Sequence, residues 1–347
     1  MRIEDFDYLL PPDRIAQVPL ERREDSRLMV VNRQTGVIQH RCFHDLSSIL
    51  TQGDLLVLNN TRVFPARLEG LKIPGGALIE MLLLEDLGER RWKVLGRRAK
   101  RLRKGTHVEF GEKFGATVEA DMGEGLFVVQ FSAEGNWDEL LERYGQVPLP
   151  PYISRESASE QLHREDKQRY QTVYAQHRGS AAAPTAGLHF SESLLEALSQ
   201  MGVQKTFVTL HIGLDTFQPV KEEVVERHPI HAERYEISQE TSDAVNNAKF
   251  DGRRVIAVGT TAVRALESVA GEDGVLEPRH GSTRLFILPG YKFRIIDAMI
   301  TNFHLPRSTL LMLVSAFMGN TLRRRCYEEA IGGGYRFYSY GDAMLIV

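Results

Sequence analysis

Three segments of the sequence place small, polar and histidine residues directly after an apolar run. They are 183–190 (APTAGLHF), 210–216 (LHIGLDT) and 259–264 (GTTAVR). In open α/β sheets, ligands bind beyond the carboxyl ends of strands, where the free N–H groups of following helices attract anions. Gly259, Thr260 and Thr261 stand at such a junction and could hold a carboxylate or a phosphate. Arg264 follows one helical turn later. The alternative role for Thr261 is that of an ordinary helix N-cap.

Five histidines lie in the second half of the chain, each close to glycine, proline or a polar turn. They are His189, His211, His228, His231 and His304. Histidine titrates near neutral pH, so a histidine at a strand end can serve as a general acid or base. The common role of a single histidine is nevertheless structural hydrogen bonding. We therefore expect two or three of the five to be catalytic or to contact substrate.

The pair His228-Pro-Ile-His231 raises the alternative of a metal-dependent hydrolase. Proline between the two histidines disfavours the helix that commonly presents such ligands on one face, and no third ligand stands at a diagnostic spacing. We therefore expect no metal site. The sequence also contains neither a Walker A loop nor a G-x-G-x-x-G fingerprint, so the usual nucleotide-binding motifs are absent.

One segment of the chain is strongly basic. Residues 90–104 (RRWKVLGRRAKRLRK) hold nine basic residues in fifteen and no acid, including Arg97, Arg98, Lys100 and Arg101. On one face of a small domain this run would form a positive stripe able to neutralise phosphates and release counterions. The alternative is a solvated surface balanced by acids elsewhere in the fold. The pattern favours a polyanion such as RNA without saying which one.

The C-terminal segment 335–343 (YRFYSYGDA) is rich in aromatic residues. Its alternation of side chains predicts a strand with two different faces, followed by an exposed turn at Gly341 and Asp342. The aromatic side chains could close the core, or one of them could stack on a purine base.

The composition is that of an ordinary globular protein large enough for two domains. Of the 347 residues, 42% are hydrophobic and 26% are charged, and the formal charge of −3 gives no global indication of nucleic-acid binding. Apolar runs such as 310–314 are too short to span a bilayer, and no secretory signal is visible. Cys42 and Cys326 cannot form a disulfide framework, so we expect a soluble cytoplasmic protein without a membrane partner.

Strands and helices alternate in the part of the chain that must position the candidate residues. A buried strand is expected at 54–58, and further strands at 207–212, 255–258 and 295–300. Helices are expected after the N-caps Ser191 and Ser308, and over 262–270. This alternation is typical of a layered α/β architecture.

The segment between 67 and 130 has a different texture, because its short apolar runs are broken repeatedly by glycine. It predicts a small β-barrel, and the proline-rich stretch 147–153 is expected to be the return connection. The expected fold is therefore α/β, with a main domain built from both chain ends. We place that domain at 1–66 and 148–347, and the inserted barrel, with a surface that could bind a polyanion, at 67–147.

Six motifs in register resemble those of the S-adenosylmethionine:tRNA ribosyltransferase-isomerase family of queuosine biosynthesis. They are 54–62 (DLLVLNNTR), 182–190 (AAPTAGLHF), 211–217 (HIGLDTF), 259–267 (GTTAVRALE), 301–310 (TNFHLPRSTL) and 335–343. The resemblance runs from the opening 5–11 (DFDYLLP) to the last strand without evident gaps.

The resemblance implies a reaction and two substrates. The ribosyl group of S-adenosylmethionine would be transferred and isomerised onto 7-aminomethyl-7-deazaguanine at the wobble position of tRNA, releasing adenine and methionine. S-adenosylmethionine would act as a cosubstrate, no metal would be needed, and we expect the chain to work as a monomer. The sulfonium acidifies the neighbouring C5′ hydrogens, so the chemistry needs a base, a proton donor for adenine and electrostatic support.

The positions of the motifs also suggest residue roles. His189 or His211 would be the base at C5′, and Asp215 would orient the histidine or assist adenine departure. The residues expected around S-adenosylmethionine are Thr185, Gly187, Gly213, Thr260, Thr261 and Arg264, with Arg264 paired to its carboxylate. Those expected to approach the modified base are Asn59, Asn60, Arg62 and His304.

A non-catalytic RNA-binding protein is the rival from a different class. In that reading the barrel binds RNA and the α/β domain is a scaffold. It accounts for the basic run 90–104 but not for the convergence of histidine, threonine and glycine on several strand ends.

Overall fold

The computed structural model describes residues 1–97, 102–155, 159–213 and 220–347. The chain divides into two compact units, which are described separately. The larger unit comprises Met1–Arg62, Pro150–Glu156 and Arg169–Val347, and the smaller comprises Val63–Leu149 and Ser157–Gln168. Within the described part of the chain, no helix is long and apolar enough to cross a membrane.

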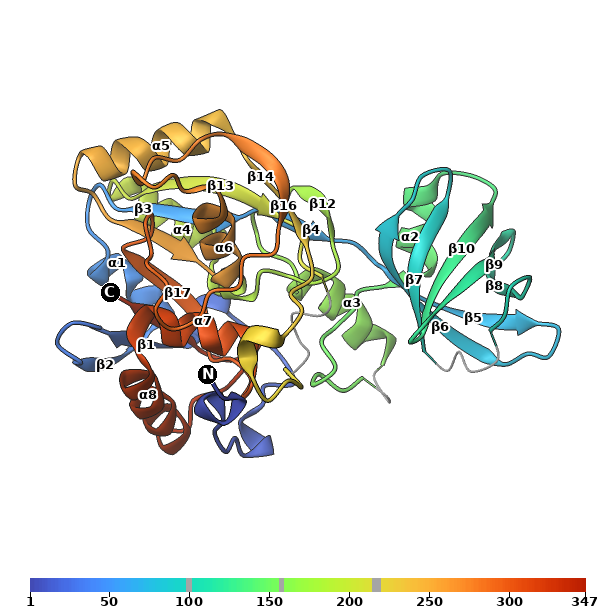
Figure 1. Cartoon of the computed structure of the whole chain (residues 1–347), viewed down its shortest axis with the longest axis horizontal. Coiled ribbons are helices and arrows are strands. Elements are labelled where there is room, and N and C mark those ends of the chain that lie inside the picture. Colours follow the sequence, from blue (N-terminus) through green and yellow to red (C-terminus); the bar gives the residue numbers. More distant parts are fainter. Residues whose placement is uncertain (98–101, 156–158, 214–219) are drawn as a thin grey trace. The chain divides into compact units, whose positions relative to one another are not determined.

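The larger unit is built on a nine-stranded mixed sheet (Figure 1). In spatial order its strands are β16 (Arg279–Thr283), β14 (Glu233–Ile237), β13 (Gln204–Leu210), β3 (Leu55–Asn59), β15 (Val255–Val258), β17 (Ala298–Asn302), β18 (Ala343–Ile346), β1 (Arg27–Val31) and β2 (Ile38–Cys42). The four neighbours β13, β3, β15 and β17 run parallel. Their carboxyl ends therefore meet at one edge of the sheet.

Both faces of this sheet are covered, so the central strands β3, β15 and β17 are buried at every residue. In β3, Leu55 and Val57 contribute to one hydrophobic core, and Leu56 and Leu58 contribute to the other. The first core also receives the helices α5 (Gln239–Phe250), α6 (Thr260–Val269), α7 (Thr309–Met318) and α8 (Asn320–Gly332). The second receives α1 (Leu46–Ile49) and α4 (Glu192–Gln200). Helices thus cover both faces of the sheet, as a layered α/β fold requires.

Serine caps fix the starts of two of these helices as expected. Ser191 Oγ accepts a hydrogen bond from Leu194 N at 3.1 Å, and Ser308 Oγ accepts one from Leu311 N at 3.2 Å. Helix α6 begins two residues earlier than expected, at Thr260, because its N-cap is Gly259 with φ +87°. Both threonines of the junction therefore lie in the first helical turn.

The smaller unit contains a closed barrel of six strands. They are β5 (Arg67–Ile73), β6 (Leu78–Asp86), β7 (Arg91–Arg97), β8 (His107–Gly111), β9 (Phe114–Gly123) and β10 (Leu126–Ala133), and pairing of β5 with β8 closes the barrel. Aromatic side chains such as Phe114 and Phe131 stack in its core. The expected fold class, a layered α/β domain interrupted by a small β-barrel, is confirmed.

Short elements complete the chain. They are the strands β4 (Thr61–Val63), β11 (Gly145–Gln146) and β12 (His177–Ser180), the helices α2 (Trp137–Tyr144) and α3 (Glu160–Arg169), and the 3₁₀ turns η1 (Ile3–Phe6), η2 (Pro12–Arg14), η3 (Arg23–Asp25), η4 (Phe43–Asp45), η5 (Thr185–His189) and η7 (Val225–Arg227).

The strand expected over 335–343 is wrong for most of its length. The last strand, β18, begins at Ala343, and the preceding residues form a compact turn in which Tyr338 has φ +71°. The Asp342 carboxylate stabilises this turn by accepting hydrogen bonds from the backbone N–H groups of Arg27 and Arg336, both at 2.8 Å. Aromatic alternation predicted a strand here, but the side chains pack in the core around a turn instead.

Candidate active site

The ends of the parallel strands are tied together by one buried asparagine. Asn59, the last residue of β3, donates its side-chain amide to Leu210 O at 3.0 Å and to Thr261 Oγ1 at 3.1 Å. Its Oδ1 accepts from the backbone N–H groups of Leu210 and Thr61, each at 3.1 Å. Asn59 is fully buried, so these bonds hold β3, β13 and α6 in a fixed arrangement.

A cavity lies beyond these strand ends, and we call it the threonine pocket. It encloses about 360 Å³ of empty space, its open mouth included. Its lining residues are Ala183, Pro184, Thr185, Ala186, Ile212, Gly259, Thr260, Thr261, Thr301, Asn302, His304 and Leu310. Four predicted residues from three motifs, Thr185, Thr260, Thr261 and His304, therefore line one cavity.

His189 lies next to this pocket and hydrogen-bonds one of its lining residues. Its Nε2 is 3.1 Å from Asn302 Nδ2, and its Nδ1 is 2.8 Å from Ser26 Oγ. The Asn302 amide also donates to Tyr338 O at 3.0 Å, which fixes the orientation of that amide. Nε2 of His189 is therefore an acceptor, and the ring proton resides on Nδ1.

The surroundings of His189 keep its imidazole neutral. Burial, followed by the positive charges of Arg23 and Arg336, lowers the pKa of His189 to about 3. Burial alone lowers the pKa of His304 to about 3. His304 Nε2 lies 2.7 Å from Thr301 Oγ1. Both histidines are thus uncharged at neutral pH and offer hydrogen-bonding atoms rather than charge.

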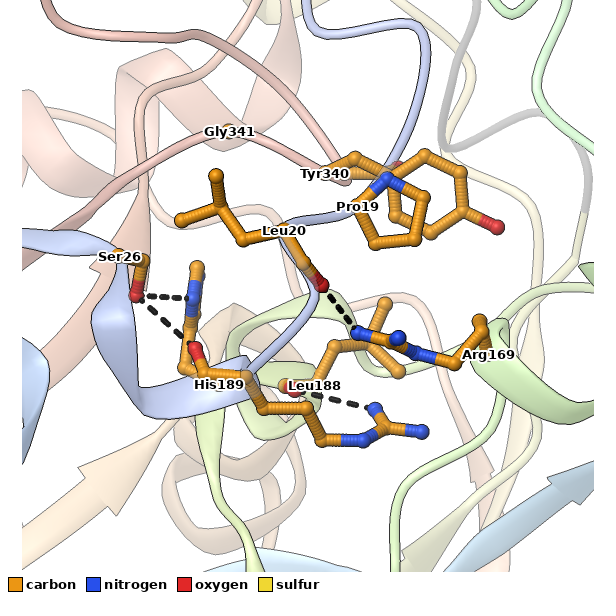
Figure 2. Close-up of a pocket in the computed structure, with 10 residues that line it drawn as sticks. Pro19, Leu20, Ser26, Arg169, Leu188, His189, Tyr340 and Gly341 are labelled. Carbon is orange, nitrogen blue, oxygen red and sulfur yellow. Dashed lines mark hydrogen bonds between the residues drawn. The ribbon is translucent and has the colours of Figure 1, made fainter.

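A second cavity borders His189, and we call it the arginine pocket. It encloses about 310 Å³, mouth included, and is lined by Pro19, Leu20, Arg23, Ser26, Arg169, Leu188, His189, Ser339, Tyr340 and Gly341. Figure 2 shows Arg169, Ser26 and Tyr340 around the His189 imidazole. Because His189 lines this cavity and Asn302 lines the threonine pocket, their hydrogen bond crosses the wall between the two cavities.

Comparison with known proteins shows the family of the chain. The family model described as "Queuosine biosynthesis protein" matches residues 3–346. The chain belongs to the queuosine biosynthesis protein family.

Several full-length relatives share one enzyme name. The chain is similar to S-adenosylmethionine:tRNA ribosyltransferase-isomerases of Desulfitobacterium hafniense, at 52% identity, and Halothermothrix orenii, at 50%, with 100% of both chains covered in each case. It is also similar to the crystal structure of S-adenosylmethionine tRNA ribosyltransferase from Thermotoga maritima, with 37% identity, a TM-score of 0.56 and coverage of 99% of this chain and 100% of that one. The predicted family and enzyme class are confirmed.

Arg264 does not line either pocket. Its guanidinium forms a buried ion pair with Glu233 and donates to Leu285 O at 3.1 Å. Glu233 also accepts from Gly213 N at 3.2 Å. A substrate carboxylate at Arg264 would therefore have to compete with the Glu233 carboxylate. In the structure, Arg264 instead holds Glu233 in place to accept the hydrogen bond from Gly213 N.

Gly187 has a packing role that its sequence position did not reveal. A Cβ at this position would lie 2.0 Å from Tyr174 Oη and 2.8 Å from Thr172 Cγ2. Only glycine allows η5 to pass so close to the Tyr174 side chain. The residue shapes the segment that carries Thr185 and His189.

His211 lies apart from His189, on the side of the strand ends where β4 and β12 pair. Its Nδ1 is 2.8 Å from Thr61 Oγ1, and its ring packs over Gly179. Burial is the first cause that lowers the pKa of His211, and the charge of Arg234 adds to it. It lines neither pocket.

The other predicted residues fall in three groups. Asn60 accepts from Thr209 Oγ1 at 2.7 Å and supports the strand ends, whereas the Arg62 side chain is exposed on β4. In the basic run, Arg97 lies 3.7 Å from Glu80, and so part of its charge is balanced within the barrel. The remaining predicted residues, Asp215, Arg98, Lys100 and Arg101, lie outside the described residues.

Among the pocket residues that sequence reasoning missed are Asn302, Ser26, Arg23 and Arg169. Asn302 stands beside His304 in the motif 301–310, and that neighbourhood was the available signal. Ser26, Arg23 and Arg169 carry no local signal, because they come together only in the fold. Among the described residues, the side chains grouped closely enough to hold a metal are Cys42, His44 and Asp45, away from the His228 pair.

Proposed function

We propose that the threonine pocket binds S-adenosylmethionine and that the chain transfers its ribosyl group to 7-aminomethyl-7-deazaguanine at the wobble position of tRNA. One observation carries the assignment: Thr185 from one motif and Thr260 and Thr261 from another line one cavity, whose wall contains the Asn302–His189 hydrogen bond. The first turn of α6, with Gly259 as N-cap, supplies free N–H groups suited to the methionine carboxylate.

The reaction needs a base beside C5′ of the ribosyl group. Removal of a C5′ proton next to the sulfonium forms an ylide that expels adenine. Attack by the aminomethyl nitrogen and loss of methionine then leave the epoxycyclopentanediol on the base. Preorganised hydrogen bonds around the reacting atoms would support the charge that develops in these steps.

Two histidines remain candidates for the base, and they differ in placement and availability. Nε2 of His189 is an acceptor directed at the threonine-pocket wall, so it could take a proton if Asn302 yields its hydrogen bond. The His211 ring forms a hydrogen bond with Thr61 Oγ1 but does not line the pocket. The placement favours His189 as the base. Asp215 would assist adenine departure.

The β-barrel is proposed as a tRNA-binding surface. Within the described part of the basic run, Arg103 and Lys104 are exposed. We expect Arg103→Glu/Lys104→Glu to weaken tRNA binding about tenfold and to lower its salt dependence, with S-adenosylmethionine binding unchanged. The matched control reverses two exposed charges of the larger unit, Arg41 and Lys205. Equal losses in both double variants would remove the barrel from the RNA path.

The assignment of the threonine pocket is tested by equilibrium binding of S-adenosylmethionine. Thr260→Val removes a hydroxyl from the pocket at nearly constant shape, and we expect it to weaken binding about tenfold. Thr206→Val is the control, since Thr206 is equally buried but bonds Thr241 away from the pocket. Unchanged affinity in Thr260→Val, or equal losses in both variants, would contradict the assignment.

A further inference from the structure

The arginine pocket contains two guanidinium groups that main-chain carbonyls hold in place. Arg23 Nη1 donates to Leu188 O at 3.0 Å. Arg169 donates to Glu21 O at 3.1 Å and to Leu20 O at 2.5 Å. A guanidinium carries five N–H donors, and the buried Nε of Arg169 has no hydrogen-bond partner among the described residues. The two groups are therefore preorganised, and Arg169 retains donor capacity.

Among the described residues that line this pocket, two are arginines and none is acidic. Burial lowers the pKa of Arg23, and the positive charge of Arg169 is the next cause. The two positive charges repel one another in a partly buried cavity, and a bound anion would relieve that repulsion. The hydroxyl groups of Ser26, Ser339 and Tyr340 would complete the polar surroundings of such an anion.

The position of the pocket indicates what that anion belongs to. Its wall includes His189, whose other ring nitrogen bonds Asn302 of the threonine pocket. If S-adenosylmethionine occupies the threonine pocket, the polynucleotide substrate must bring its reacting base to the same wall. Each nucleotide carries phosphodiester groups on both sides, and guanidinium groups pair with phosphate through parallel hydrogen bonds.

We propose that Arg23 and Arg169 bind one phosphodiester group of the tRNA that flanks the nucleotide being modified. The proposal rests on the proposed function, because it takes the threonine pocket as the site of the other substrate. The methionine carboxylate is not the anion expected here, since the N-terminus of α6 provides for it within the threonine pocket.

The first test measures tRNA binding without S-adenosylmethionine over a range of salt concentrations. Arg23→Gln and Arg169→Gln should each weaken binding about tenfold and lower the slope of log K against log salt by about 0.7 to 0.9. Arg23→Lys and Arg169→Lys keep the charge, so they should keep the slope and lose less affinity. Arg41→Gln is the matched control, since Arg41 is exposed and lines neither pocket.

The second test locates the phosphate. Single methylphosphonate substitutions along the anticodon loop remove one backbone charge at a time. In the wild-type enzyme, one substitution next to the modified nucleotide should weaken binding about tenfold, and in Arg23→Gln the same substitution should have no further effect. Additive effects at every position, or a slope change equal to that of Arg41→Gln, would overturn the proposal.

Binding of S-adenosylmethionine to the same variants separates the two hypotheses. It should stay within about twofold of wild type in Arg23→Gln and Arg169→Gln. Loss of S-adenosylmethionine affinity with unchanged tRNA affinity would assign the pocket to the methionine carboxylate and overturn the phosphate proposal. The proposed function is tested separately, by comparing S-adenosylmethionine binding in Thr260→Val with that in the control Thr206→Val.

Discussion

The Asn302 amide donates to Nε2 of His189 at 3.1 Å while its Oδ1 lies 3.3 Å from Thr185 Oγ1 as hydrogen-bond acceptor. One buried side chain thus links a hydroxyl of the threonine pocket to the imidazole in its wall. A ligand that hydrogen-bonds Thr185 would therefore shift the Asn302 amide, and with it the hydrogen bond that Asn302 donates to the lone pair of His189 Nε2. We infer that Asn302 is a positioning residue for His189.

Asn302→Asp tests whether His189 must be neutral to act. A carboxylate beside the imidazole favours its charged form, so it should raise the pKa of His189 from about 3. The acid limb of the kcat/KM profile should then move to higher pH by about one unit or more. Asn302→Ala removes the hydrogen bond without adding charge and should leave that limb in place. An unmoved acid limb in Asn302→Asp would argue against His189 as the base.

The two buried histidines should make the fold sensitive to mild acid. His189 and His304 each have a pKa lowered to about 3, against 6.5 in the unfolded chain. Above pH 6.5 both states are neutral and contribute no pH dependence; below it the unfolded chain binds protons that the folded chain does not. The free energy of unfolding should therefore fall between pH 6.5 and 3, by roughly 1 kcal/mol per pH unit for each histidine.

His304→Gln isolates one of these contributions. Its unfolding free energy, measured by denaturant titration at several pH values, should show a slope smaller by about that amount. The control is His280→Gln, because His280 is exposed on β16. Equal slopes in wild type and His304→Gln would mean that His304 is protonated in the fold.

Gly187→Ala should destabilise the protein because the new methyl group would overlap Tyr174 Oη. We expect a loss of about 2 kcal/mol or more in the free energy of unfolding. Tyr174 Oη is buried without a hydrogen-bond partner among the described residues, so Tyr174→Phe alone should cost little. The double variant should recover part of the loss. Additive losses in the double variant would show that the overlap is not the cause.

Arg264 and Glu233 form a buried ion pair, and replacing only one of the two residues should lower the free energy of unfolding strongly. Arg264→Met leaves the Glu233 carboxylate unpaired, for a loss of about 3 kcal/mol or more in unfolding free energy. Arg264→Met/Glu233→Met should restore much of the stability. If the double variant also binds S-adenosylmethionine normally, Arg264 is structural. A specific loss of S-adenosylmethionine binding would instead place Arg264 at the methionine carboxylate.

The sequence predicted the elements whose signals are local. Val255–Val258 is a strand as expected, and Ser191 and Ser308 cap their helices, because a buried strand and an N-cap are each decided by a few neighbouring residues. The prediction of a strand over 335–343 was wrong because aromatic alternation is equally compatible with a strand and with a turn whose rings pack inward. The positive φ of Tyr338 depends on hydrogen bonds to Asp342 that only the fold provides.

The site residues likewise divide into those that local sequence signals predict and those that only tertiary contacts define. Residue types at strand ends indicated Thr185, Thr260 and Thr261, because parallel strands bring their carboxyl ends to one edge. The partners of those residues could not be predicted, since Asn302 and Arg169 gain their roles from contacts with distant segments. The same limit applies to Arg264, whose pairing with Glu233 is a tertiary contact.

The most direct test of the central claim is mass spectrometry of tRNA carrying 7-aminomethyl-7-deazaguanine after incubation with the enzyme and S-adenosylmethionine, with free adenine measured in parallel. The wild type should yield epoxyqueuosine and an equal amount of adenine. Thr260→Val should yield both at a reduced rate that recovers at high S-adenosylmethionine concentration. Folded enzyme that binds both substrates yet forms neither product would contradict the proposed function.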